Sequence, residues 1–396
     1  DDGDDDDDDD DDELCEAPDE NDTLIRPNVV SWTAVINAWA RCTQRDMKGR
    51  RAQAIFDEMV ELYDNGIDSG GDGSGDFEQL KPNLFAFHAV ITAWVRSNEQ
   101  GASSKALALL EQLSARYNAT GDETLKPDAR AFNLVINAIA RSREPDCADR
   151  AASLLHQMEE LYVEGDLEMQ PDASTFGSII NAYANSGQDG SSDKAIQILQ
   201  QMESLYQLGY KTVKPNTFVY NSCINAFAKS TLVREAPANA QKAQELLNWM
   251  ERQYREHNDA TVKPDVISYA TCINAHANSR EADAGQKAGA LLEKMIDLYI
   301  MGDKDVKPNA VAYTAVLKAY LNSIANTTEG EQQRQGRLQD AAKKCLDMVV
   351  QMCLLYRNGD RKVKPTKITF DLATEILDKA GDADGKARIE MLRQGI

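Results

Sequence analysis

The 396-residue sequence lacks the features that mark several classes of protein. It has no run of eighteen apolar residues, which excludes a membrane-spanning helix. Its seven cysteines form no C-x-x-C pair, so they predict buried thiols in a reducing compartment rather than disulfides or a zinc site. Its four histidines have no metal-ligand spacing, and we find no phosphate-binding glycine loop or nucleophile motif. We therefore predict no catalytic residue, metal, cofactor, small-molecule substrate or membrane partner.

Basic residues are in the minority, 43 against 65 acidic residues, and the net charge is −22. Residues 1–22 hold 16 of the acids and no lysine or arginine. Removing these 16 charges from −22 leaves −6 on residues 23–396. Because like charges repel and nothing in this run can be buried, we predict a disordered acidic tail at 1–22. It is a solvated tail or, alternatively, an electrostatic mimic that competes for a basic groove. The sequence begins with Asp1 rather than Met, which indicates a fragment or processed form in which a targeting peptide is not visible.

One phrase returns eight times in residues 23–396, as in KPNTFVYNSCINAFAK from Lys214 and KPDVISYATCINAHAN from Lys263. Its prolines lie 55, 45, 44, 44, 49, 44 and 57 residues apart, at Pro27, Pro82, Pro127, Pro171, Pro215, Pro264, Pro308 and Pro365. The underlying period is therefore 44, with insertions in the first, fifth and seventh units.

Each unit predicts two helices. The residue after each proline is a good helix N-cap and starts a unit: Asn28, Asn83, Asp128, Asp172, Asn216, Asp265, Asn309 and Thr366. Apolar residues then recur at helical spacing, followed by a polar loop and a second amphipathic helix that ends near a glycine such as Gly209. Nothing alternates with a period of two. We predict an all-α protein, a right-handed superhelical solenoid of about eight helix-turn-helix repeats spanning 23–396.

Each first helix carries a stripe of residues on one face, spaced by three, four and four positions. The order is apolar, polar, polar, then basic or amide, as in Val30, Thr33, Asn37 and Arg41. An apolar group can stack between bases, a small polar group can reach a base edge, and a cation can meet a phosphate. The expected stacking residues are Val30, Phe85, Phe218, Ile267 and Val311. The expected phosphate ligands are Arg41, Arg96, Arg141 and Lys229.

The units resemble pentatricopeptide repeats. The resemblance rests on the K-P-D/N turn, the aromatic residue four positions later, the INA core and the A…L…M second helix, and it extends from Asn28 to Ile396. It implies single-stranded RNA as the partner, read at one base per repeat, in mitochondrial or chloroplast RNA processing, stability or translation, with other RNA-processing proteins as further partners. One departure is the period, which is about 35 residues in the family and 44 here.

The resemblance also implies which residues read bases. Each reading pair joins the residue after the early aromatic to the residue after the next proline. The pairs are Thr33 with Asn83, His88 with Asp128, Asn133 with Asp172, Gly177 with Asn216, Asn221 with Asp265, Ala270 with Asn309, and Thr314 with Thr366. Threonine with asparagine implies adenine, and asparagine with aspartate implies uracil. No base is assigned to the other pairs, and neither Gly177 nor Ala270 has a side chain that can bond a base edge.

Some of these residues also have structural explanations. An N-cap is needed whether or not RNA binds, so half of each pair is explained without RNA. We expect one row of asparagines to form a hydrogen-bond ladder between repeats: Asn37, Asn137, Asn181, Asn225 and Asn274. The recurrent lysines before the prolines are unfavourable to the helix dipole, which points to the family pattern or a ligand instead. The alternative function is a protein-interaction scaffold whose groove holds an extended peptide.

Overall fold

The computed structural model describes residues 27–43, 47–68, 78–97, 99–142, 144, 146–230, 234–325 and 331–396, so the predicted tail at 1–22 lies outside the described residues. Within these ranges the chain is helical and has no β-strand, which confirms the all-α prediction. The α-helices are α1 (Val29–Arg41), α2 (Lys48–Asp68), α3 (Leu84–Arg96), α4 (Ala102–Thr120), α5 (Ala129–Ser142), α6 (Cys147–Val163), α7 (Ala173–Ser186), α8 (Ser191–Gln207), α9 (Thr217–Lys229), α10 (Ala236–His257), α11 (Val266–Ser279), α12 (Ala284–Ile300), α13 (Ala310–Ala325), α14 (Glu331–Arg357), α15 (Lys367–Ala380) and α16 (Ala383–Gln394).

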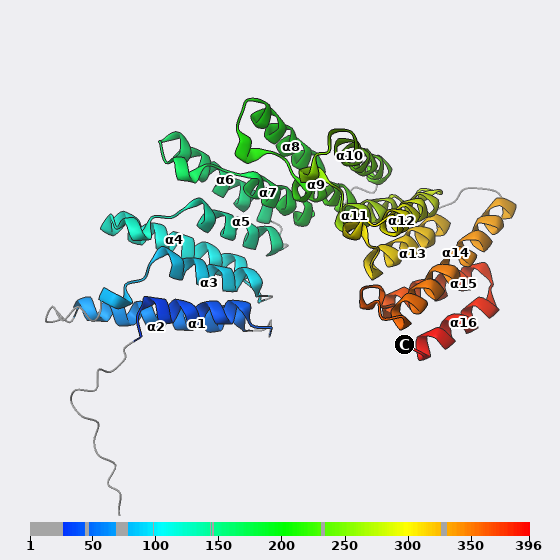
Figure 1. Ribbon diagram of the computed structural model, residues 1–396, viewed down its shortest axis with the longest axis horizontal. Coiled ribbons are helices and arrows are strands. Elements are labelled where there is room, and N and C mark those ends of the chain that lie inside the picture. Colours follow the sequence, from blue (N-terminus) through cyan, green and yellow to red (C-terminus); the bar gives the residue numbers. More distant parts are fainter. Residues whose placement is uncertain are drawn as a thin grey trace, which may run out of the picture.

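The helices form eight consecutive pairs that stack into an arched solenoid (Figure 1). Each odd-numbered helix contacts the next odd-numbered helix and the even-numbered helices on either side of it in sequence. The odd-numbered helices line the inner side of the arch, and the even-numbered helices lie outside them (Figure 1). One face of each first helix is therefore left for the inner surface of the arch.

The eight predicted N-cap residues each precede a first helix. Their side chains accept hydrogen bonds from free amides of the first turn, as Asn28 does from Val30 and Ser31 at 3.0 Å. The same holds for Asn83, Asp128, Asp172, Asn216, Asp265, Asn309 and Thr366. Each such cap stabilises a helix by about 1 kcal/mol relative to alanine, so the caps fix where the units begin.

The core lies between the paired helices. The early aromatics Tyr220, Tyr269 and Tyr313 are buried, whereas Trp32 in α1 is partly exposed because no described repeat precedes it. The described cysteines are free thiols; all but Cys42 are buried. Burial, with a smaller contribution from Glu251, raises the pKa of Cys272 to about 12, which keeps its thiol protonated and unreactive.

The 44-residue period is explained by an added element after most of the second helices. The chain turns through a glycine in the left-handed region, such as Gly209 at φ 102°, and forms a short 3₁₀-helix before the next proline. These are η1 (Glu78–Leu80), η2 (Glu123–Leu125), η3 (Leu167–Met169), η4 (Lys211–Val213), η5 (Ala260–Val262), η6 (Lys304–Val306) and η7 (Arg361–Val363). From η2 onward, the last residue of each is buried, so the added turn is anchored in the core.

Five of the six recurrent lysines have a structural role, which the expectation of a family pattern or a ligand did not include. Each of the five bonds an aspartate that caps the next 3₁₀-helix along the chain, with Nζ to carboxylate distances of 2.6 to 3.0 Å. The pairs are Lys81–Asp122, Lys126–Asp166, Lys214–Asp259, Lys263–Asp303 and Lys307–Asp360. A hydrogen bond from Thr124, followed by one from Lys81, lowers the pKa of Asp122. Where Gln170 replaces the lysine, Tyr210 replaces the aspartate, so both partners of that ion pair are absent together.

Candidate nucleic-acid interface

The five expected stacking residues are all exposed large apolar side chains, on α1 and α3 and then on α9, α11 and α13; Arg130 and Ser174 occupy the position in α5 and α7. Phe85 in α3 is 69% exposed and Phe218 in α9 is 46% exposed; Val30, Ile267 and Val311 lie at the same position in α1, α11 and α13. Ile368 in α15 repeats the pattern. Single exposed apolar residues are ordinary, but a row in register along one surface indicates contact with another molecule. That the contact is base stacking stays a prediction.

The expected phosphate ligands lie in the last turns of the inner helices α1, α3, α5 and α9. Arg41, Arg96 and Arg141 are exposed, and none forms an ion pair with any described residue. Lys229 is also exposed, and its Nζ donates to Asn185 Oδ1. A cation in the last turn of a helix is favoured by the helix dipole, so these positions suit basic residues before any ligand arrives.

The structure brings two of the proposed reading pairs into direct contact. His88 Nε2 lies 2.9 Å from Asp128 Oδ1, and Asn221 Nδ2 donates to Asp265 Oδ1 at 3.0 Å. Burial opposes ionisation of Asp128, but the bonds from His88 and the Ala131 amide outweigh it, and the pKa of Asp128 is lowered. In these two pairs the aspartate is therefore an N-cap that also bonds the reading residue.

Three buried hydroxyl groups that the sequence interpretation missed connect readers to the next unit. Thr175 Oγ1 donates to Asn133 Oδ1 at 2.7 Å, and Ser268 Oγ donates to Asn221 Oδ1 at 2.6 Å. Thr369 Oγ1 lies 3.1 Å from Thr314 Oγ1. All three hydroxyls also complete a capping box with the N-cap three residues earlier. That capping-box pattern was visible in the sequence and is the signal that would have identified them.

At three other reading positions the side chain is bonded within its own helix, covered by a neighbour or apolar. Thr33 Oγ1 donates to the carbonyl of Val29 in its own helix at 2.6 Å. The ring of Phe218 covers Gly177, where an added Cβ would lie 2.6 Å from a ring carbon. Phe218 thus fills the space that a reading side chain would occupy in the fourth unit, and Ala270 is buried without a polar group.

The expected asparagine ladder is wrong in its position. The ladder forms four residues later, where Asn185, Asn278 and Asn322 each donate to a carbonyl of the preceding first helix at 2.7 Å. The row expected to form it has no side-chain hydrogen bond to any described residue and is partly exposed: Asn37, Asn137, Asn181, Asn225 and Asn274. These amides are free to bond a ligand.

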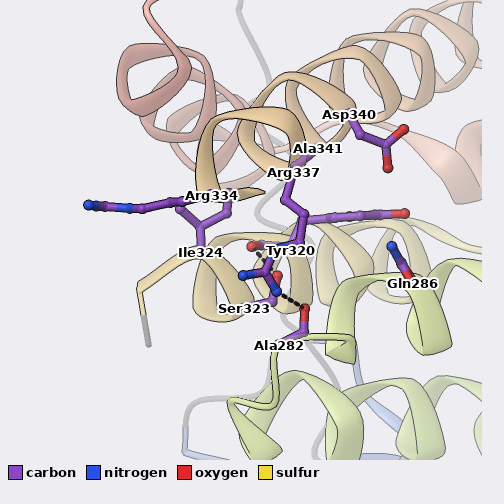
Figure 2. Close-up of a pocket in the computed structure, with 9 residues that line it drawn as sticks. All are labelled: Ala282, Gln286, Tyr320, Ser323, Ile324, Arg334, Arg337, Asp340 and Ala341. Carbon is purple, nitrogen blue, oxygen red and sulfur yellow. Dashed lines mark hydrogen bonds between the residues drawn. The ribbon is translucent and has the colours of Figure 1, made fainter. Parts of the chain in front are cut away.

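Two hollows of the surface are poorly suited to a substrate or an anion. The one in Figure 2 lies between α12, α13 and α14; its volume is about 20 Å³, and Arg337 bonds the carbonyl of Ala282 beside it. That is room for about one water molecule. A cleft of about 610 Å³ lies near Arg141, but Glu99 and Glu144 also line it and oppose an anion. Among the described residues no cluster of His, Cys, Asp and Glu is arranged to hold a metal.

None of the described helices is both long and apolar enough to span a membrane. The model of the pentatricopeptide repeat domain matches residues 153–230, which run from α6 to the end of α9. A search of curated proteins gives no match. Among solved structures, the chain is similar to the pentatricopeptide repeat protein PPR10 from maize, with 17% identity and a TM-score of 0.36. The match covers 94% of this chain and 54% of the maize protein, so the chain spans about half of that protein's length.

The stacked and capped helix pairs define an α-solenoid repeat protein. The match at 153–230 gives the kind of repeat, and the same turn and helix pair recur on both sides of it. Residues 153–230 thus match a pentatricopeptide repeat domain, and they lie within a longer array of similar helix pairs.

Proposed function

We propose that the inner surface of the solenoid binds single-stranded RNA sequence-selectively, with one base per repeat in the units that can read one. The protein would then act as an adaptor in RNA processing, stability or translation in a mitochondrion or chloroplast, together with other RNA-processing proteins. The observation that carries this proposal is the shared register of three kinds of residue on the inner helices: exposed apolar residues on five of them, polar readers on most, and arginines without an ion pair to any described residue on α1, α3 and α5. A nucleotide offers a flat base face, a base edge and a phosphate, which these rows can meet in that order.

The proposed bases differ in support between units. Thr33 with Asn83 would read adenine. Asn133 with Asp172 would read uracil directly, and Asn221 with Asp265 would do so only after the Asn221 amide leaves its bond to Asp265. The fourth unit would read no base because Phe218 lies over Gly177. Few basic residues line the surface and the protein is acidic overall, so we expect modest affinity and a shallow dependence on salt.

The test is a selection of RNA by the whole chain from a randomised single-stranded pool, followed by sequencing of the bound fraction at several salt concentrations. Enrichment of adenine and uracil two to four bases apart, weakening as salt rises, is the expected result. If no RNA is retained at low salt, RNA binding is wrong.

The second candidate is a scaffold that holds an extended peptide. The row of unbonded asparagine amides favours it, since a peptide backbone presents donors and acceptors that such amides can pair. Partners that co-purify with the chain and resist ribonuclease treatment would support the scaffold over the RNA reader.

A further inference from the structure

The inference concerns the asparagine row of Asn37, Asn137, Asn181, Asn225 and Asn274, and it rests on the proposed binding of RNA. These residues occupy one position in five of the eight units, and Thr92, Lys318 and Glu375 occupy it in the other three. The reader row beside it is far more varied, with threonine, histidine, asparagine, glycine and alanine. A position that reads bases has to vary from unit to unit, whereas a constant position fits a group that every nucleotide shares.

The fold does not explain why this position is constant. Asparagine is not favoured inside a helix, because its side chain competes for backbone groups. Here the five side chains have no hydrogen bond to any described residue, although they are partly buried. The asparagines four residues later form the hydrogen bonds between repeats, as when Asn185 bonds the carbonyl of Ala140. A recurrent polar group without a structural partner indicates a ligand contact.

The position of the row along the helix identifies which shared group it meets. In α5 the reader is Asn133, the row residue is Asn137 and the basic residue is Arg141, each one helical turn, or about 6 Å, from the next. The base edge and the phosphate stand at the two ends of a nucleotide, with the sugar between them. The row therefore faces the sugar when the reader faces the base and the arginine faces the phosphate.

The chemistry of the amide matches the sugar better than the phosphate. A side-chain amide has both donors and an acceptor, and the ribose 2′-hydroxyl also donates and accepts. A phosphate only accepts, and Arg41, Arg96 and Arg141 already offer it charged donors. We propose that the asparagine row binds the ribose 2′-hydroxyls and so makes the surface select RNA over DNA of the same sequence.

The first measurement needs no variant. The whole wild-type chain is titrated with one RNA taken from the selection, with the same sequence as DNA, and with its 2′-O-methyl form, which keeps the acceptor and loses the donor. Binding should be strongest to RNA, weaker to the 2′-O-methyl form and weakest to DNA, by about tenfold or more between RNA and DNA. Equal affinity for RNA and DNA would overturn the proposal.

The second measurement uses the variant N137A/N181A. We expect it to bind the RNA about tenfold more weakly and the DNA less than twofold more weakly, because only the 2′-hydroxyl contacts are removed. The matched control is Asn118→Ala, an exposed asparagine on the outer helix α4, which should leave both affinities unchanged. Denaturation midpoints of both variants report whether the fold is retained.

The outcomes separate this inference from the proposed function. If the wild-type chain retains no RNA, the proposed function fails. If it binds RNA with a base preference but N137A/N181A weakens RNA and DNA equally, only the role of the asparagine row fails. Competition of RNA binding by a generic extended peptide, lost in the same variant, would assign the row to a peptide backbone and overturn the ribose proposal.

Discussion

Two turns of the solenoid carry the same proposed reading pair but hold it differently. At the turn Gln170–Asp172, Asn133 is partly exposed, its Oδ1 accepts from Thr175, and its Nδ2 has no partner among the described residues. At the turn Lys263–Asp265, Asn221 is only 7% exposed, and both ends of its amide are bonded, to Ser268 and Asp265. We call the first the open turn and the second the tied turn.

The same contrast extends to the ion pairs beside the readers. In the tied turn, Lys263 lies 2.8 Å from both Asp303 and Asp305. In the open turn, Gln170 stands in the place of that lysine, and Tyr210 in the place of the aspartate. The same asparagine–aspartate pair therefore leaves a free amide donor in one unit and is bonded within the protein in the other. The identities of the two residues alone do not distinguish these two cases.

The largest difference should appear in stability. Asn221→Ala removes two bonds from a buried network, whereas the capping-box bonds between Ser268 and Asp265 remain, so the free energy of unfolding should fall by about 2 kcal/mol. Asn133→Ala removes one bond at a partly exposed site and should cost about 1 kcal/mol. Urea denaturation of the two variants measures the difference. Equal losses would mean that the two turns are equally tied.

Base preference should change more in a variant of Asn133 than in a variant of Asn221, which is the reverse of the order expected for stability. Asn133 can donate its free amide to a base carbonyl, so Asn133→Ser should reduce the preference for uracil at that position by about tenfold. Asn221 must first break its bond to a carboxylate, so Asn221→Ser should change the preference at its own position by less than about threefold. Selection from the randomised pool with each variant measures both shifts, with Asn118→Ser as the control. A larger shift for Asn221→Ser would contradict the distinction between the open turn and the tied turn.

The sequence predicted where the repeats begin, because the signals that set these positions are local. A proline followed by Asn, Asp or Thr fixes the start of a helix through bonds within three residues, and all eight caps form. The aromatic residues that follow stand at a fixed helical spacing from the cap, and Tyr220 and Tyr269 are buried. Which units repeat, and where the first helix of each unit starts, could be predicted without a structure.

What sequence reasoning missed depends on contacts between units. Asn133 and Asn221 are each followed by the same cap, and their difference lies in whether the amide also reaches that cap across the repeat boundary. The ladder asparagines were placed one turn too early, because Asn181 and Asn185 are both amides on one helix face and only the packing decides which reaches Ala140. The ion pairs of the lysines likewise link residues about 40 positions apart.

The ion pairs give a smaller way to separate the turns. Lys263→Gln makes the tied turn resemble the open one and removes two partly exposed ion pairs, which should cost about 0.5 kcal/mol. The converse variant Q170K/Y210D should gain a few tenths of a kcal/mol, whereas Gln170→Lys alone should gain nothing because Tyr210 offers no carboxylate. Urea midpoints at low and high salt measure these effects. A gain from Gln170→Lys alone would show that the lysine acts without its aspartate.

The smallest expected effect is the acid sensitivity of the segment that precedes the tied turn. A hydrogen bond from Thr261, followed by one from Lys214, lowers the pKa of Asp259, which lies four residues before Lys263. A carboxylate whose folded pKa is depressed stabilises the fold above its unfolded value, near 3.8, and loses that contribution as pH falls through the folded pKa. Stability should therefore fall below about pH 4, and Lys214→Met should make this fall shallower by a few tenths of a kcal/mol, since the pair is partly solvated. Urea denaturation of the wild type and the variant between pH 6 and pH 2.5 measures the difference. Parallel curves would show that the Thr261 bonds alone set the ionisation of Asp259, and that the lysine of this pair contributes contact rather than charge.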